Sequence, residues 1–181
     1  MAKKIAVLIG SLRKESYNRK VAQEVIALAP SSLELEIVEI GQIPHYNEDL
    51  DKDEPAKEFT AFREELKKFD GFLFFTPEYN RSVPSALKNA LDVGSRPPGK
   101  SIWKGKPGAV VSVSQSAIGG FGANHHLRQS MVFLDVFMMQ QPEAYIGSVG
   151  KLFDKDGKLV EDTKEFLKKY ITAYASWVDK F

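Results

Sequence analysis

Short runs of apolar residues recur along the chain, each about the length of one β-strand. Three of these runs are continuous, at residues 5–9, 71–75 and 109–113. A continuous apolar run of this length is typical of a strand that is buried on both faces, as in a parallel sheet. Apolar and charged residues alternate at 35–40, which predicts a strand at an edge of the sheet, and a shorter run at 136–139 predicts a fifth strand.

Between these runs, apolar residues recur at the spacing of an amphipathic helix. Pro55 and Pro84 stand near the starts of two such segments, where proline fits a helix. Strand and helix alternate five times, which predicts a doubly wound α/β sheet with helices on both faces. The predicted helices cover residues 18–29, 55–68, 82–93, 124–134 and 162–181.

The length and the charge of the chain narrow the class of function. A chain of 181 residues fits one domain, which we expect to span residues 1–181. The formal net charge is +1, which excludes a strongly basic nucleic-acid-binding protein. No apolar stretch reaches the roughly 18 residues that cross a membrane. We therefore expect a cytoplasmic protein that binds neither nucleic acid nor membrane.

Cysteine is absent from the sequence. This excludes disulfides, thiolate nucleophiles, iron–sulfur clusters and cysteine zinc sites, and it fits a reducing cytoplasm. The adjacent His125 and His126 would point in different directions on a helix, so they are poorly placed to share one ion. We therefore expect no metal site.

The segment after the first predicted strand, residues 10–18, is rich in hydroxyl groups and leads directly into a helix. Ligands of open α/β sheets bind beyond the carboxyl ends of the strands, which is where this segment lies. It contains neither a dinucleotide-binding glycine fingerprint nor a P-loop. Ser11, Ser16 and Asn18 can each donate a hydrogen bond to a phosphate oxygen, and the helix N-terminus adds free backbone N–H groups. Arg13 adds a positively charged guanidinium that can donate two parallel hydrogen bonds, so a terminal phosphate monoester suits the segment. The alternative is a polar loop in which Ser16 or Asn18 caps the helix.

The segment after the third predicted strand, residues 76–84, is stiffened by Pro77 and Pro84. Tyr79 offers a ring face, and its neighbours offer backbone donors and acceptors, which would suit a flat heteroaromatic ligand. The alternative is a structured turn in which Ser82 caps the next helix.

Serine and glycine dominate the segment after the fourth predicted strand, residues 112–122. Glycine allows a ligand to approach the backbone closely. The alternative is a flexible surface loop.

Taken together, these segments resemble the NADPH-dependent FMN reductase family, and most closely its bacterial quinone and chromate reductases. The resemblance rests on residues 10–18, 76–80, 83–84, 87–92, 119–120 and 126–129. It implies a flavodoxin-like fold, in which five parallel strands follow the order 2-1-3-4-5 and FMN binds at their carboxyl ends.

The resemblance also implies roles for single residues. The residues that it assigns to the FMN phosphate and its loop are Ser11, Arg13, Ser16, Tyr17 and Asn18. Those that it assigns to the isoalloxazine ring, largely through backbone groups, are Pro77, Glu78, Tyr79 and Asn80. Those that would complete the pocket are Ser112, Ser114, Gly119 and Gly120. Arg81 follows the ring-binding segment, and we expect it to favour anionic substrates or the phosphate of the nicotinamide nucleotide.

The implied reaction is ping-pong. NAD(P)H, as NADPH or NADH, delivers a hydride to flavin N5, and a quinone, an azo compound or chromate then takes the electrons. The flavin carries this chemistry, so no catalytic acid or base of the protein is obligatory. Similar proteins are homodimers or homotetramers with the flavin near the subunit interface, and we expect residues 82–93 and the region around Arg128 to contribute to it. The alternative function is a flavodoxin-like electron carrier that does not itself oxidise NAD(P)H. Such carriers are usually acidic, whereas this chain has a net charge of +1.

Overall fold

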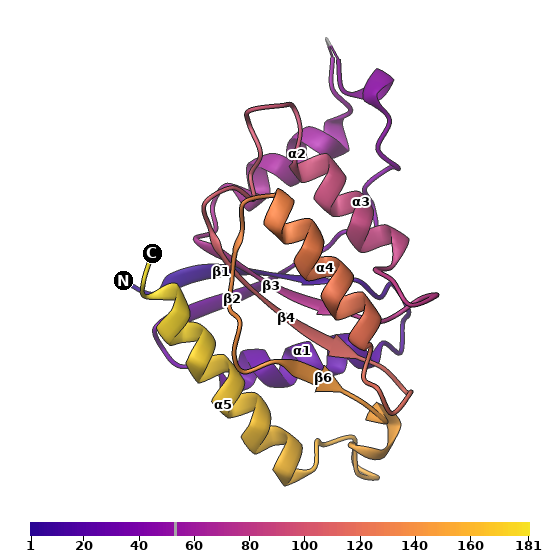
Figure 1. Ribbon diagram of the computed structural model, residues 1–181, viewed down its shortest axis with the longest axis vertical. Helices are drawn as coiled ribbons and strands as arrows, with labels where there is room; N and C mark the ends of the chain where they lie inside the picture. The colour runs from indigo at the N-terminus through magenta and orange to yellow at the C-terminus, as the bar shows by residue number, and fades with distance from the viewer. Residues whose placement is uncertain (53) are drawn as a thin grey trace.

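The computed structural model describes residues 1–52 and 54–181, and a parallel β-sheet forms its centre (Figure 1). The strands are β1 (Lys3–Ile9), β2 (Leu33–Val38), β3 (Gly71–Thr76), β4 (Pro107–Val113), β5 (Phe137–Met138) and β6 (Ala144–Ile146). Neighbouring strands follow the order β2-β1-β3-β4-β5, and β6 pairs with the C-terminal half of β4. The predicted order and the parallel direction are therefore confirmed. β6 is an additional strand that the apolar pattern did not predict.

Helices cover both faces of the sheet, as predicted. The helices are α1 (Tyr17–Leu28), α2 (Lys57–Leu66), α3 (Ser85–Gly94), α4 (Phe121–Phe133) and α5 (Glu161–Val178), with short 3-10 helices η1 (Glu48–Leu50) and η2 (Val149–Lys151). α1 and α5 pack on one face, and α2, α3 and α4 pack on the other (Figure 1). Among residues 1–52 and 54–181, no helix has both the length and the apolar character needed to cross a membrane.

The central strand β1 shows why a continuous apolar run is needed here. Ile5 and Val7 belong to the core under α1 and α5, whereas Ala6 and Leu8 belong to the core under α2, α3 and α4. Successive side chains of a strand point to opposite faces, so a strand between two helical layers must be apolar at every position.

β2 lies at the edge of the sheet, as its alternating pattern predicted, and within the described chain it pairs with β1 alone. Leu33 and Val38 are buried at its ends, and Glu34 and Glu36 are exposed. The edge strand therefore has a charged side that faces solvent.

The C-terminal helix α5 is tied to the sheet by two buried tyrosines. The Tyr170 hydroxyl donates to the carbonyl oxygen of Val110, and the Tyr174 hydroxyl to that of Phe72, each over 2.8 Å. Burial raises the pKa of both phenols well above the ordinary value, because the charged form would lose its solvation. These bonds hold α5 against β3 and β4.

Two helices begin three residues away from their predicted starts, and the other three begin within two residues of theirs. α3 begins at Ser85 with Pro84 as its N-cap, rather than at residue 82, because Ser82 belongs to the preceding turn, where its backbone pairs with Tyr79. α4 begins at Phe121 rather than at residue 124. The N-cap of α4 is Gly120, so no local side chain marks this start in the sequence.

Candidate functional site

Three loops leave the sheet at the same edge. Ile9 of β1 pairs with Phe75 of β3, and Thr76 of β3 pairs with Ser112 of β4, so these parallel strands end side by side. We call the segments that follow them the β1 loop (residues 10–16), the β3 loop (77–84) and the β4 loop (114–120). Their common origin brings segments together that lie about a hundred residues apart in sequence.

The β1 loop ends at Ser16, which is the N-cap of α1. Its hydroxyl oxygen accepts a hydrogen bond from the backbone N–H of Arg19 over 3.2 Å. Ser16 is therefore the cap, rather than Asn18. Ser11, Ser16 and Asn18 are buried, whereas Arg13 is exposed. Buried hydroxyls beside a helix N-terminus and an exposed guanidinium form a setting that attracts an anion.

Asn18 connects the β1 loop to β4. Its side-chain amide donates to the carbonyl oxygen of Val113 over 3.4 Å. Its Oδ1 atom is buried and has no hydrogen-bond partner among the described residues. Buried acceptors are nearly always paired in folded proteins, so this atom is suited to a donor on a bound molecule.

The β3 loop contains a tight turn with an unusual backbone. Asn80 and Arg81 have positive φ angles of 50° and 64°. The flanking Tyr79 and Ser82 exchange backbone hydrogen bonds of 3.2 and 2.9 Å. Two successive positive φ angles define a type I′ turn, which normally favours asparagine followed by glycine. The turn presents Tyr79 to solvent, with 57% of the residue exposed.

Glu78 joins the β3 loop to the start of α4. One carboxylate oxygen accepts from Arg81 Nη1 over 2.8 Å, and the other accepts from the backbone N–H of Ala123 over 3.1 Å. Because Gly120 at the N-cap has no side chain, Glu78 satisfies a free N–H group of α4 from another loop.

The β4 loop turns sharply before α4. Gly119 and Gly120 have φ angles of +62° and +76°, which residues with a Cβ rarely adopt. Ser112 lies beneath this turn, and its buried hydroxyl donates to the carbonyl oxygen of Ala144 and accepts from the Asn124 amide. Ser114 faces its own loop, where its Oγ accepts from the backbone N–H of Ser116 over 3.1 Å.

The three loops enclose a pocket of about 200 Å³. The predicted site residues that line it are Ser11, Arg13, Ser16, Tyr17, Asn18, Pro77, Glu78, Tyr79 and Ser114. The predicted residues outside its lining are Asn80, Arg81, Ser112, Gly119 and Gly120. Val113, Gln115 and Val149 also line it without having been predicted. Val149 comes from η2, and no motif in the sequence marks it.

His125 and His126 point apart, as expected for neighbours on a helix. His125 Nε2 lies 3.0 Å from the Tyr145 hydroxyl, and His126 Nδ1 lies 3.0 Å from the Ser82 hydroxyl. Burial and a hydrogen bond with Glu143 raise the pKa of Tyr145 to about 12. The two histidines therefore connect α4 to β6 and to the β3 loop, respectively.

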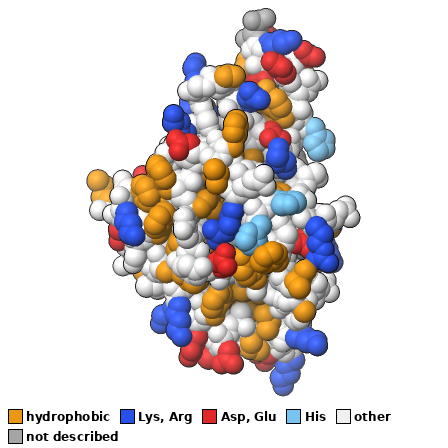
Figure 2. All heavy atoms as spheres, viewed as in Figure 1, with side chains coloured by type: hydrophobic (Ala, Val, Ile, Leu, Met, Phe, Trp, Pro, Cys, Tyr) orange, Lys and Arg blue, Asp and Glu red, His pale blue; other side chains and the backbone are white. Residues whose placement is uncertain are grey.

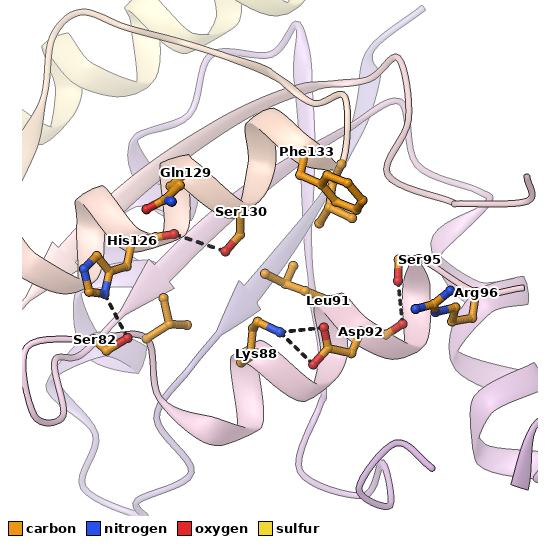
Figure 3. A pocket seen from close by; sticks show the side chains of 12 residues that line it. Ser82, Lys88, Leu91, Asp92, Ser95, Arg96, His126, Gln129, Ser130 and Phe133 are labelled. Atoms are coloured by element: carbon orange, nitrogen blue, oxygen red, sulfur yellow. Dashed lines mark hydrogen bonds and ion pairs between the residues drawn. The ribbon is translucent and has the colours of Figure 1, made fainter. Parts of the chain in front are cut away.

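A larger hollow of about 560 Å³ lies between α3 and α4 and shares no lining residue with the pocket (Figure 3). Lys88 and Asp92 form an ion pair of 2.7 Å along α3, and Phe133 of α4 borders the hollow with 90% of the residue exposed. Figure 2 shows hydrophobic side chains scattered among charges of both signs on the face that α4 crosses in Figure 1. This second hollow lies away from the ends of β1 and β4.

Comparisons with known proteins identify the family. Residues 3–151 match the NADPH-dependent FMN reductase family. The chain belongs to this family. It is 62% identical to a quinone reductase of Pseudomonas putida, over 96% of this chain and 94% of that protein.

Solved structures agree with this membership. The flavoenzyme NAD(P)H:(acceptor) oxidoreductase FerB from Paracoccus denitrificans superposes with a TM-score of 0.91 at 39% identity, over 99% of this chain and 98% of FerB. A flavodoxin, WrbA-like protein from Agrobacterium tumefaciens superposes with a TM-score of 0.66 at 14% identity, over 99% of both chains, and shows the fold alone. The flavodoxin-like fold is thus confirmed. As a member of the NADPH-dependent FMN reductase family, the protein uses FMN as its cofactor and NAD(P)H as its co-substrate, as the resemblance implied.

Proposed function

We propose that this protein is a cytoplasmic NAD(P)H-dependent quinone reductase whose chain, residues 1–181, forms a single FMN-binding domain. The observation that carries the proposal is the 62% identity, over 96% of the chain, to a protein named quinone reductase. The pocket at the ends of β1, β3 and β4 supports it, because ligands of doubly wound sheets bind at this edge.

The β1 loop holds the phosphate end of FMN in this proposal. Ser11 and Ser16 donate hydroxyl hydrogen bonds to phosphate oxygens, Arg13 supplies the positive charge, and Tyr17 forms a wall of the same pocket. Asn18 has a different role from the other polar groups, because it accepts a hydrogen bond from the ligand. Its buried Oδ1 needs a donor, which a phosphate dianion cannot provide but the ribityl hydroxyls of FMN can.

The β3 loop holds the isoalloxazine ring. A volume of about 200 Å³ is below the roughly 300–1,000 Å³ of pockets that enclose a drug-sized ligand, so part of FMN lies outside the walls. Pro77, Glu78 and Tyr79 border the open side, and the Asn80 backbone continues it. The conformation of the β4 loop is fixed by Ser112, Gly119 and Gly120, which do not line the pocket. Ser114 lines the pocket directly.

Bound FMN supplies the redox chemistry, because it takes a hydride from NAD(P)H and passes electrons to an acceptor. The residues of the chain hold the ring and leave one side open, where Tyr79 is 57% exposed. Such an open side accepts flat quinones, and we extend the proposal to azo compounds and chromate. Arg81, with 70% of its side chain exposed beside this opening, attracts anionic substrates.

We also propose that the protein is a homodimer or homotetramer that associates through the face formed by α3 and α4. Phe133 and Val132 are 90% and 79% exposed at the end of α4, and Phe133 borders the hollow between the two helices. Large apolar side chains this exposed are typical of an interface.

An anaerobic visible spectrum tests the function. Purified protein, freed of unbound FMN, should show oxidised flavin bands that bleach on addition of NADPH and return on addition of a quinone. Bands that NADPH does not bleach would instead indicate an electron carrier of the flavodoxin type. A protein that cannot be reconstituted with FMN would overturn the proposed site.

A further inference from the structure

We propose that Glu78 is a positioning residue: its carboxylate fastens the β3 loop to the first turn of α4 and holds the loop in the conformation that receives the flavin ring. The inference rests on the proposed FMN site. It assigns to the side chain of Glu78 a role apart from the backbone contacts that were expected of this segment.

The residue at the N-cap of α4 provides no capping side chain. Gly120 occupies the N-cap, so the free N–H groups of the first turn need acceptors from elsewhere. Glu78 Oε2 accepts from the Ala123 N–H over 3.1 Å, across 45 residues of sequence. A negative charge at a helix N-terminus is also favoured by the helix dipole. The carboxylate therefore stabilises α4 only while the β3 loop stays in place.

The turn that follows Glu78 also depends on its carboxylate. Arg81 has a φ angle of 64° at the turn position where glycine is normally favoured. Its guanidinium donates to Glu78 Oε1 over 2.8 Å. The ion pair thus stabilises a backbone conformation that is energetically unfavourable for arginine. The same carboxylate holds the turn at one oxygen and the helix at the other.

The β3 loop and the first turn of α4 lie in close contact. A Cβ added to Gly122 would lie 2.7 Å from the Arg81 carbonyl oxygen and 3.0 Å from Glu78 Oε2. Only glycine at this position lets the β3 loop approach α4 so closely. The side chain of Glu78 is only 9% exposed, against 70% for that of Arg81, so the carboxylate lies inside this contact.

Loss of the carboxylate leaves the Ala123 N–H without its acceptor and Arg81 without its partner. The β3 loop then samples other conformations, and flavin binding must restore the bound one. The apparent Kd then equals the intrinsic Kd divided by the fraction of molecules that keep the bound conformation, so binding weakens as this fraction falls. Binding of the isoalloxazine ring weakens and binding of the phosphate does not, because the proposed phosphate site lies in the β1 loop.

The test compares FMN with riboflavin, which lacks the phosphate, in titrations of flavin-free protein followed by flavin fluorescence. Glu78→Ala should raise the Kd of both ligands by the same factor, about tenfold. Glu78→Gln keeps an acceptor for the Ala123 N–H but loses the charge, so it should fall between wild type and Glu78→Ala. Arg13→Ala is the matched control, and it should weaken FMN alone.

Amide hydrogen exchange of flavin-free protein tests the contact between Glu78 and the first turn of α4 independently of FMN. The Ala123 amide should exchange faster in Glu78→Gln than in wild type, and faster still in Glu78→Ala. Unchanged Kd values in Glu78→Ala, or a loss confined to FMN, would overturn the proposal, as would equal exchange rates in all three proteins. A wild-type protein that binds neither flavin would refute the proposed function. The exchange rates would still show whether the Glu78 carboxylate holds the β3 loop against α4. If Glu78→Ala does not fold, the comparison of Glu78→Gln with wild type carries both measurements.

Discussion

The hydroxyl of Tyr174 donates a 2.8 Å hydrogen bond to the carbonyl oxygen of Phe72, a residue 102 positions earlier in the sequence. The bond is fully buried, so the phenol has no water to replace its partner. We expect Tyr174→Phe to lower the free energy of unfolding by about 1–2 kcal/mol near pH 8, the range for a buried polar group that loses its partner. Urea denaturation of flavin-free protein measures this loss, and a change below the error of the measurement would contradict it.

The same phenol predicts a dependence of stability on pH. The pKa of Tyr174 is raised in the folded protein, so above the ordinary value of 10 the unfolded chain releases a proton that the native state keeps. Stability is therefore lost as the pH rises above 10. Tyr174→Phe cannot contribute to this loss, so the difference in unfolding free energy between wild type and variant should shrink from pH 9 to pH 11. A difference that grows over this interval would show that the hydroxyl is not held in its neutral form.

Two serines of the β1 loop should respond differently to removal of their hydroxyls. Ser16 caps α1, so Ser16→Ala should cost about 1 kcal/mol of stability in flavin-free protein and also weaken FMN binding. Ser11 lines the pocket before the helix begins, so Ser11→Ala should weaken FMN binding by about tenfold with little change in stability. Urea denaturation and FMN titration of both variants separate the two effects. Equal losses of stability would refute the distinction.

The fold was predictable wherever burial on both faces forces a continuous apolar run. The runs at 5–9, 71–75 and 109–113 all lie within observed strands, because β1, β3 and β4 are covered by helices on both sides. β6 was not predictable, since three residues without a periodic pattern do not distinguish a strand from a loop.

The pocket was predictable where one loop carries the polar groups that line it. The β1 loop contains the hydroxyls, the cation and the helix cap within a few residues, and all of its predicted residues line the pocket. The start of α4 was not predictable, because its cap comes from Glu78 in a distant loop. Ser112 was expected in the pocket but bonds to Ala144 and Asn124, since the orientation of a residue at a strand end depends on β6, which the sequence did not reveal.

Arg81 provides a test of substrate charge. Its side chain is 70% exposed, so its attraction for an anion is screened by water, and Arg81→Ala should raise KM for NADPH and for chromate by about two- to fivefold at saturating FMN. KM for an uncharged quinone should not change. Arg81→Lys keeps the charge and is the matched control. Unchanged KM values for NADPH and chromate in Arg81→Ala would refute the role.

Phe133 tests the proposed oligomer. Phe133→Asp places a charge on a side chain that is 90% exposed in the isolated chain, so the fold should tolerate it while an apolar interface should not. We expect light scattering after size exclusion to give the mass of a monomer for the variant and a multiple of that mass for wild type. Val160→Asp, at the N-cap of α5 where aspartate is favoured, is the control and should keep the wild-type mass. Identical masses for wild type and Phe133→Asp would exclude α3 and α4 as the interface.

The edge strand β2 also bears on how copies of this protein meet. Glu34 and Glu36 are exposed along a strand that pairs with β1 alone in the described chain. Two such edges brought together would place carboxylates against carboxylates, so like charges oppose extension of the sheet from one molecule into the next. The chain thus discourages a sheet that continues across two copies joined at β2, and it leaves the helical faces for contacts between subunits.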